Sequence, residues 1–194
     1  MKILLTAINS KFIHSNLAVR YLKAFTKDLP YEGKIREFSI NDREERILKE
    51  IIEEKADVVA FSTYIWNVEL ISHVANLIKI VSPKTEILYG GPEVSYDSKT
   101  FMEEHVGDYL IEGEGEKTYR DFVEYKLGGK NLSDIKGLYY RENNEVIFNG
   151  PRPLMNMDEI VFPYEEDEDL NNKIVYYEGS RGCPLHTKLI HKII

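Results

Sequence analysis

The chain has 194 residues, of which 43% are hydrophobic and 30% charged, and its formal net charge at pH 7 is −8. This composition is typical of a globular protein, with length for one domain of roughly 100 to 150 residues plus an appendage, and it argues against a largely disordered chain. Because the net charge is negative and Lys and Arg form no cluster, we expect no nucleic-acid partner and no binding to an anionic membrane surface.

Two further features concern the location of the protein. No apolar run approaches the roughly 20 residues that cross a bilayer, and the start, Met1 to Leu5, leads at once into polar residues instead of the apolar stretch of a signal peptide. We therefore expect a cytoplasmic protein. Cys183 is the only cysteine, which excludes an internal disulfide, and one thiolate cannot by itself hold a zinc ion or an iron–sulfur cluster.

Short apolar runs alternate with longer amphipathic segments along the first two thirds of the chain. This alternation predicts βα units joined by right-handed crossovers over a parallel sheet. The continuous apolar run 58–61 is typical of a central strand that helices cover on both sides. The expected strands are 3–8, 34–40, 57–64, 86–89 and 108–112, and the expected helices are 16–29, 43–55, 68–81, 100–105 and 116–127. The pattern predicts an α/β domain with a five-stranded parallel sheet.

The pattern changes after this repeating unit. Residues 137–140 and 145–148 are β-type runs on either side of an Asn-Asn turn signal, which predicts a β-hairpin. The prolines of 150–153 and the acidic run 165–169 indicate an extended connector. The predicted organisation is an α/β domain over 1–130, a hairpin appendage over 131–150, an acidic linker over 151–177 and a last segment over 178–194.

A ligand of an open parallel sheet binds outside the carboxyl ends of the strands, so the loops after the strands are the candidate site. Glycines there let a ligand approach the backbone closely, although each glycine is equally explained by a tight turn. Tyr64 and Trp66 offer flat aromatic faces, and Trp66 alternatively caps the core at the start of a helix. The predicted ligand-binding residues are Asn9 and Ser10 after the first strand, Ser62, Thr63, Tyr64 and Trp66 after the third, Gly90, Gly91, Pro92, Glu93 and Val94 after the fourth, and Glu112, Gly113, Glu114 and Gly115 after the fifth.

Several more specific binding and catalytic motifs are excluded. Residues 113–118 are not a phosphate loop, because Glu116 stands where the Walker sequence needs glycine, and no G-x-G-x-x-G opens the first helix as NAD binding requires. Ser62 and Thr63 stand where a phospho-acceptor domain carries its aspartate. His14 is a lone loop histidine, which is more often a surface residue than a base or metal ligand. With no acid–base pair or activated nucleophile in the loops, we predict no catalytic residue.

The order of these loops resembles a known family. Gly90–Glu93 after the fourth strand and Glu112–Glu116 after the fifth are similar to the amino-terminal cobalamin (B12)-binding domain of B12-dependent radical SAM proteins, which include the anaerobic oxidative cyclase of magnesium-protoporphyrin IX monomethyl ester and several methyltransferases. Glu178–Pro184 resembles the lead-in to the radical SAM signature, whose three cysteines hold a [4Fe–4S] cluster. The resemblance implies a flavodoxin-like (Rossmann-like) three-layer α/β/α domain that binds cobalamin across the loops after strands three, four and five.

The chain departs from the family pattern at two places. Cys183 stands alone, because Thr187 and Ile190 occupy the positions of the second and third cysteines, so this chain forms no cluster and we expect it to be truncated at the start of the radical SAM domain. The loop after the first strand, Asn9–Asn16, lacks the D-x-H-x-x-G motif whose histidine ligates cobalt. Histidine ligation of cobalt is therefore not implied.

The resulting prediction is the cobalamin-binding module of a radical SAM enzyme of tetrapyrrole cyclase or methyltransferase type. The intact relative would be a radical SAM oxidoreductase or methyltransferase that also uses an iron–sulfur cluster and S-adenosylmethionine, with the radical SAM domain in the same chain, whereas this chain alone is not expected to catalyse the reaction. The alternatives are a ligand-free flavodoxin-like scaffold or protein-interaction domain and, with the least support, an enzyme acting on a small molecule in the same cleft.

Overall fold

The structure is a computed structural model that describes residues 1–164 and 170–181. The predicted acidic run 165–169 and the lone Cys183 lie outside the described residues. Within the described part of the chain, no helix combines the length and the apolar character that crossing a membrane requires.

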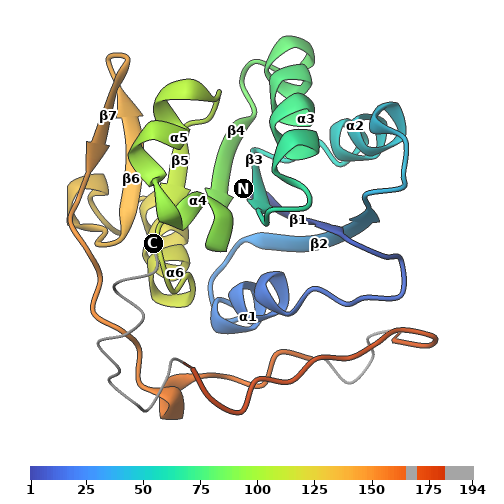
Figure 1. The fold of residues 1–194 in the computed structure, drawn as a ribbon. Coiled ribbons are helices and arrows are strands. Elements are labelled where there is room, and N and C mark those ends of the chain that lie inside the picture. The colour runs from blue at the N-terminus through green and yellow to red at the C-terminus, as the bar shows by residue number, and fades with distance from the viewer. Residues whose placement is uncertain (165–169, 182–194) are drawn as a thin grey trace, which may run out of the picture.

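One mixed β-sheet forms the centre of the molecule (Figure 1), and its strand order is β2-β1-β3-β4-β5-β6-β7. Strands β1 to β5 are parallel, and β6 and β7 are antiparallel to their neighbours. The strands are β1 (Lys2–Asn9), β2 (Glu32–Ser39), β3 (Val58–Ser62), β4 (Glu86–Gly90), β5 (Tyr109–Ile111), β6 (Leu138–Glu142) and β7 (Glu145–Phe148). The order 2-1-3-4-5 of the parallel part confirms the flavodoxin-like prediction.

The predicted number of strands is wrong, because the sheet has seven strands and not five. The hairpin of β6 and β7 was expected as an appendage to the α/β domain, but β6 pairs with β5, with Tyr109 opposite Tyr140 and Ile111 opposite Leu138. Without β6, the short strand β5 would leave its free edge of N–H and C=O groups unpaired. Leu138 and Tyr140 also carry apolar side chains into the core, so the hairpin extends both the hydrogen-bonded ladder and the packed face.

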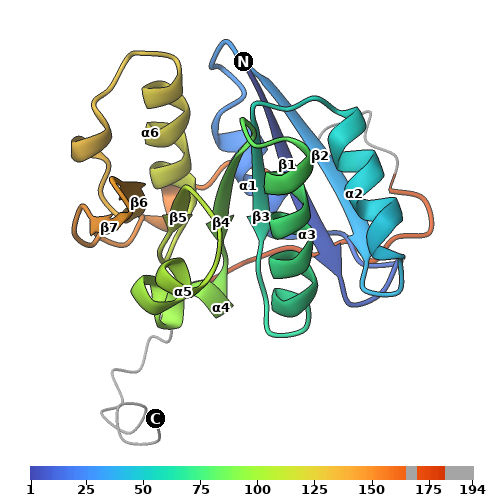
Figure 2. The same cartoon turned by 90° about the horizontal axis from the view of Figure 1, so that it is seen from above.

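Helices cover both faces of the sheet, as Figure 2 shows for α2 and α3 on one side. They are α1 (Leu17–Phe25), α2 (Glu44–Glu53), α3 (Val68–Val81), α4 (Pro92–Tyr96), α5 (Ser98–Glu104) and α6 (Glu116–Lys126), with short 3-10 turns at Leu132–Asp134 and Met157–Glu159. Alternate residues of a strand face opposite sides. Accordingly Leu4 and Ile8 of β1 pack in the cluster that includes α2, α3 and α5, whereas Ile3 and Leu5 pack in the cluster that includes α1 and α6.

Local signals explain where the helices near the site begin. The side chain of Asn16 caps α1 by accepting a hydrogen bond from the Val19 N–H at 3.2 Å. Helix α4 was not predicted, although Pro92 stands at its first position, where the fixed φ of proline suits a helix start. It is a single turn that follows Gly91 directly, too short for helical periodicity to reveal it.

The described residues after β7, 149–164 and 170–181, form a segment that we call the connector, and it returns across the carboxyl ends of the strands. In Figure 1 it runs along one side of the molecule, past α6 and then α1. Arg152 contacts Asp121 of α6, and Ile174 forms a parallel bridge with His14 in the loop after β1. The connector therefore lies next to the loops in which the sequence predicted a site.

Candidate ligand-binding site

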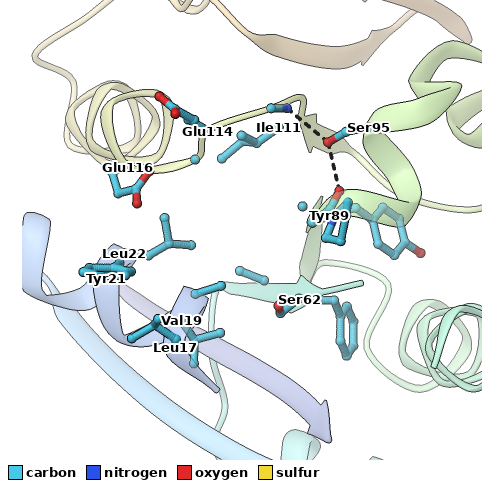
Figure 3. Close-up of a pocket in the computed structure, with 18 of the residues that line it drawn as sticks. Leu17, Val19, Tyr21, Leu22, Ser62, Tyr89, Ser95, Ile111, Glu114 and Glu116 are labelled. Carbon is cyan, nitrogen blue, oxygen red and sulfur yellow. Dashed lines mark hydrogen bonds between the residues drawn. The ribbon is translucent and has the colours of Figure 1, made fainter. Parts of the chain in front are cut away.

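A cavity of about 540 Å³ opens at the carboxyl ends of β3, β4 and β5. We call it the slot. It lies on the face of the sheet that α1 and α6 cover, and Figure 3 shows α1 and the start of α6 on either side of it. The loops after β3, β4 and β5 form its rim, as expected for a parallel sheet whose ligand binds where the strands end.

The floor of the slot is apolar and recessed because the sheet supplies small residues there. Leu5, Ala60 and Leu88 are neighbours across β1, β3 and β4 and form one row of the floor. In the next row, Gly90 pairs with Ile111 of β5. Ala60 and Gly90 project little or nothing from the sheet, so the space above them remains open to a ligand.

Ser62 is the one polar side chain of this second row. It pairs with Gly90 and is only 6% exposed, and its hydroxyl has no hydrogen-bond partner among the described residues. A buried hydroxyl without a partner costs about 1 to 3 kcal/mol. A ligand atom in the slot that accepts or donates a hydrogen bond would remove this cost.

The two neighbouring glycines have different roles. Gly91 has φ of +118°, and a Cβ there would lie 2.9 Å from the Thr63 N and closer still to the Thr63 carbonyl oxygen. Gly91 is thus required by the tight turn itself. A Cβ on Gly90 would meet its nearest atoms, those of Ile111, only at 3.9 Å, so Gly90 keeps the slot open without being required by the backbone.

Ser95 of α4 joins the two glycine-containing loops. The Gly113 N–H donates to the Ser95 hydroxyl at 3.1 Å, and this hydroxyl donates to the Gly91 carbonyl at 2.9 Å (Figure 3). The loop after β5 is thereby fixed to the loop after β4 at the mouth of the slot.

A charged cluster forms another wall. Glu116 at the start of α6 is 5% exposed and pairs with Arg181 of the connector, which also donates to Glu178 at 2.8 Å. The Arg181 guanidinium lies over the ring of Tyr21 of α1, 5.3 Å from its centroid. Burial by itself would lower the pKa of Arg181, but the hydrogen bonds with Glu116 and Glu178 outweigh it and raise the pKa above the ordinary value of arginine.

The structure brings about half of the predicted residues to the slot. Those that line it are Ser62, Tyr64, Gly90, Gly91, Pro92, Gly113, Glu114 and Gly115. Those that do not line it are Asn9, Ser10, Thr63, Trp66, Glu93, Val94 and Glu112.

The residues outside the slot have identifiable surroundings. Asn9 donates to the His14 carbonyl and to Glu37, and Glu112 accepts from Tyr139 at 3.1 Å. Trp66 is 47% exposed, and its ring stacks on that of Tyr64, which does line the slot, with the centroids 4.5 Å apart. The aromatic pair therefore stands at the rim, where a large ligand would extend out of the slot.

Sequence reasoning missed two contributors to the walls. One face of α1, including Leu17 and Leu22, lines the slot, and so do Leu154 and Arg181 of the connector. The periodicity of α1 marks its apolar face but does not separate the part that packs in the core from the part that borders a cavity. No local pattern places the connector residues, since their neighbours in the slot are distant in the sequence.

Sequence comparisons relate the chain to known proteins. The sequence model of the B12 binding domain matches residues 3–123 of the chain. The chain is similar to an uncharacterized methyltransferase of Pyrococcus horikoshii, with 33% identity over 58% of this chain and 26% of the relative. It is also similar to the cobalamin-dependent radical SAM methyltransferase TokK of Streptomyces tokunonensis, with 33% identity over 50% of this chain and 14% of that enzyme.

A solved structure has the same fold. The cobalamin-dependent S-adenosylmethionine radical enzyme OxsB, solved with aqua-cobalamin and S-adenosylmethionine bound, superposes with a TM-score of 0.69 at 20% identity, over 82% of this chain and 24% of that one. The chain thus spans about a quarter or less of the length of the proteins that it matches.

Proposed function

The chain belongs to the B12 binding domain family, and we propose that it holds cobalamin over the slot as the cofactor-binding part of a longer B12-dependent radical SAM enzyme. Its family membership confirms the resemblance found in the loops Gly90–Glu93 and Glu112–Glu116. The observation that carries the proposal is the hydroxyl of Ser62, which has no partner among the described residues and lies in an otherwise apolar floor of the slot.

The residues of the slot fit the chemistry of this cofactor. Cobalamin combines a broad corrin ring, neutral amide side chains and a nucleotide tail that ends in a heteroaromatic base. The recessed floor at Ala60 and Gly90 suits a flat heteroaromatic group, and Ser62 offers one hydrogen bond to a heteroatom of that group. Tyr64 with Trp66 offers an aromatic surface at the rim. The glycine loops allow the corrin amides to approach backbone groups closely.

The activity of the whole enzyme forms part of the same proposal. Bound cobalamin supplies a cobalt centre that carries a methyl group or an electron, and the iron–sulfur cluster and S-adenosylmethionine belong to a radical SAM domain elsewhere in the longer chain. We propose that the reaction class is methyl transfer or tetrapyrrole cyclisation. We also propose the division into an α/β domain over 1–130, a hairpin over 131–150, a linker over 151–177 and the start of the radical SAM domain over 178–194, and a cytoplasmic location. The net charge of −8 supports a small-molecule ligand over a nucleic acid.

Titration with hydroxocobalamin and with methylcobalamin, followed by the visible spectrum and by heat, tests the proposal. The blocked variant is Gly90→Leu, because the new side chain has room at its Cβ and then fills the slot. Gly91→Trp is unsuitable as a blocked variant, since its Cβ would collide with the backbone of Thr63 and disturb the fold. Gly129→Leu is the matched control, because Gly129 is exposed, has no positive φ and lies outside the slot.

We expect saturable binding by the original chain and by Gly129→Leu, and at least about tenfold weaker binding by Gly90→Leu with an unchanged melting temperature. Absence of binding of both cobalamins by the original chain would refute the proposal.

A second candidate function, a protein-interaction domain, is favoured by one observation. Apolar side chains are exposed in the loops after β1 and β3 and in the connector, namely Phe12 at 71%, Ile65 at 76% and Leu154 at 84%. Exposed apolar groups concentrated in one region mark interaction surfaces. This function would be favoured if the chain bound no cobalamin but still associated with another protein through these exposed apolar side chains.

A further inference from the structure

The connector approaches the slot in a segment that we call the strap, residues 170–181. Its first part is fixed to the loop after β1. Ile174 donates its N–H to the Ile13 carbonyl at 2.7 Å and accepts from the Ser15 N–H at 3.2 Å and from the Ser15 hydroxyl at 2.8 Å. The Lys173 ammonium lies 3.8 Å from the centroid of the Phe12 ring.

The end of the strap is fixed at the slot itself. Arg181 pairs with Glu116, and its guanidinium lies over Tyr21, so one strap residue bridges α6 and α1. Glu178 of the strap also pairs with Arg181 and directs it. All four side chains line the slot.

The pairing with Arg181 matters because Glu116 is buried. Its side chain is 7% exposed, and an ionised carboxylate that is removed from water needs a partner. When the strap leaves, Glu116 loses the guanidinium and the slot loses a wall. The departure of the strap is therefore opposed by this buried ion pair, in addition to the hydrogen bonds of Ile174 with the loop after β1.

We propose that residues 170–181 act as a strap that closes the slot, that the pair Arg181–Glu116 is its latch, and that a ligand in the slot and the docked strap stabilise each other. The coupling to cobalamin rests on the function proposed above. A ligand in the slot contacts strap residues that line it, so binding favours docking, and by thermodynamic reciprocity docking favours binding. Arg181 is a positioning residue in this scheme.

The latch is tested first in the ligand-free chain. Chymotrypsin cleaves after tyrosine and needs an extended, free segment on both sides of the bond. Tyr177 is 74% exposed but lies between the contacts of Ile174 and Arg181, so the rate of cleavage there reports how often the strap leaves. We expect Arg181→Met and Glu116→Gln each to accelerate this cleavage about fivefold or more. The double variant should be no faster than Arg181→Met, because that change already removes the pair with Glu116.

A matched control pair exists far from the slot. Arg46 and Glu50 of α2 form an exposed ion pair at 2.8 Å, and neither lines the slot. Arg46→Met and Glu50→Gln should leave the cleavage after Tyr177 unchanged. Equal cleavage rates in the original chain and in Arg181→Met, or accelerations that multiply in the double variant, would overturn the latch.

The coupling is tested by adding hydroxocobalamin. We expect saturating cofactor to slow the cleavage of the original chain several-fold, and Arg181→Met to release bound cofactor about tenfold faster with little change in the association rate. Arg181→Lys should restore part of the retention, since it keeps the charge that faces Glu116.

Two outcomes would contradict the coupling. If the original chain binds cobalamin and Arg181→Met releases it no faster, the coupling is refuted and the proposed function stands. A chain that binds no cobalamin refutes both the proposed function and the coupling, while the cleavage of the ligand-free chain still decides whether the latch exists.

Discussion

Gly91 and Thr63 are packed backbone against backbone, so that a Cβ on Gly91 would lie 2.9 Å from the Thr63 N. The Thr63 N–H at the same place donates to the carbonyl of Gly90 at 2.7 Å. The loops after β3 and β4 therefore meet through main-chain atoms, and their side chains remain available for the rim of the slot.

The first prediction follows from this packing. Gly91→Ala should lower the free energy of unfolding by about 3 kcal/mol, because alanine would have to adopt the positive φ of Gly91 and its Cβ would collide with the Thr63 backbone. Gly90→Ala should change it by less than about 1 kcal/mol. Urea denaturation of both variants checks the prediction, and a similar loss in the two would contradict the assigned difference between these glycines.

Ser62→Ala should affect stability and binding in opposite directions. Removal of a buried hydroxyl without a partner should leave the ligand-free chain equally stable or up to about 1 kcal/mol more stable, whereas cobalamin affinity should fall about fivefold through the lost hydrogen bond. Thermal unfolding and spectral titration measure the two effects.

Ser72 provides the control for this prediction. It is 7% exposed and its hydroxyl likewise has no partner among the described residues, but it belongs to α3 and does not line the slot. Ser72→Ala should change stability in the same direction as Ser62→Ala and leave the affinity unaltered. A similar loss of affinity in both variants would remove Ser62 from the site.

Ser95→Ala should loosen the loop after β5, because it deletes the hydroxyl that links Gly113 to Gly91. We expect an approximately fivefold loss of cobalamin affinity, equivalent to about 1 kcal/mol. Ser95→Thr keeps the hydroxyl and should restore binding. Ser98→Ala is the comparison variant, since Ser98 also donates to the carbonyl four residues before it, and neither Ser98 nor its other partner, Glu112, lines the slot. Calorimetric titration of the three variants measures the affinities. If Ser98→Ala lost as much affinity as Ser95→Ala, the role assigned to the Ser95 hydroxyl would be wrong.

The stability of the fold should depend on pH through Glu54. Hydrogen bonds from Lys34, Lys2 and Arg36 lower the pKa of this carboxyl from 4.5 to about 2. Because the pKa is lower in the folded state, the stabilisation is complete above about pH 4.5 and is lost as the pH falls from there towards 2. The difference in unfolding free energy between the original chain and Glu54→Gln should therefore be larger at pH 7 than at pH 3.

Glu53→Gln is the control for the acid dependence, because Glu53 is exposed and has only a distant ion pair with Lys49, at 3.8 Å. Its unfolding free energy should follow that of the original chain at every pH. Denaturant unfolding between pH 3 and pH 7 provides the measurement, and a constant difference between the original chain and Glu54→Gln would rule out the assigned role of Glu54.

The sequence predicted the main elements because their signals are local. Helix α3 spans Val68–Val81, as its apolar periodicity indicated, and the apolar run 58–61 lies in the central strand β3. The β-hairpin was also expected from its turn. Its attachment to the edge of the sheet was missed, because the pairing of β6 with β5 depends on which strand edge is free, and that is known only when the sheet is assembled.

For the site, the sequence by itself predicted which residue types form the rim. Parallel strands end at one edge of the sheet, and the loops that follow them can be identified directly in the sequence. Ser62, Tyr64 and the glycine loops were found in this way. The tertiary structure alone decided which of these residues face the slot and what closes it. Arg181 and Glu116 are 65 residues apart. A contact over that distance results from the packing of α1, α6 and the connector on one face of the sheet, and no local pattern of residues encodes it.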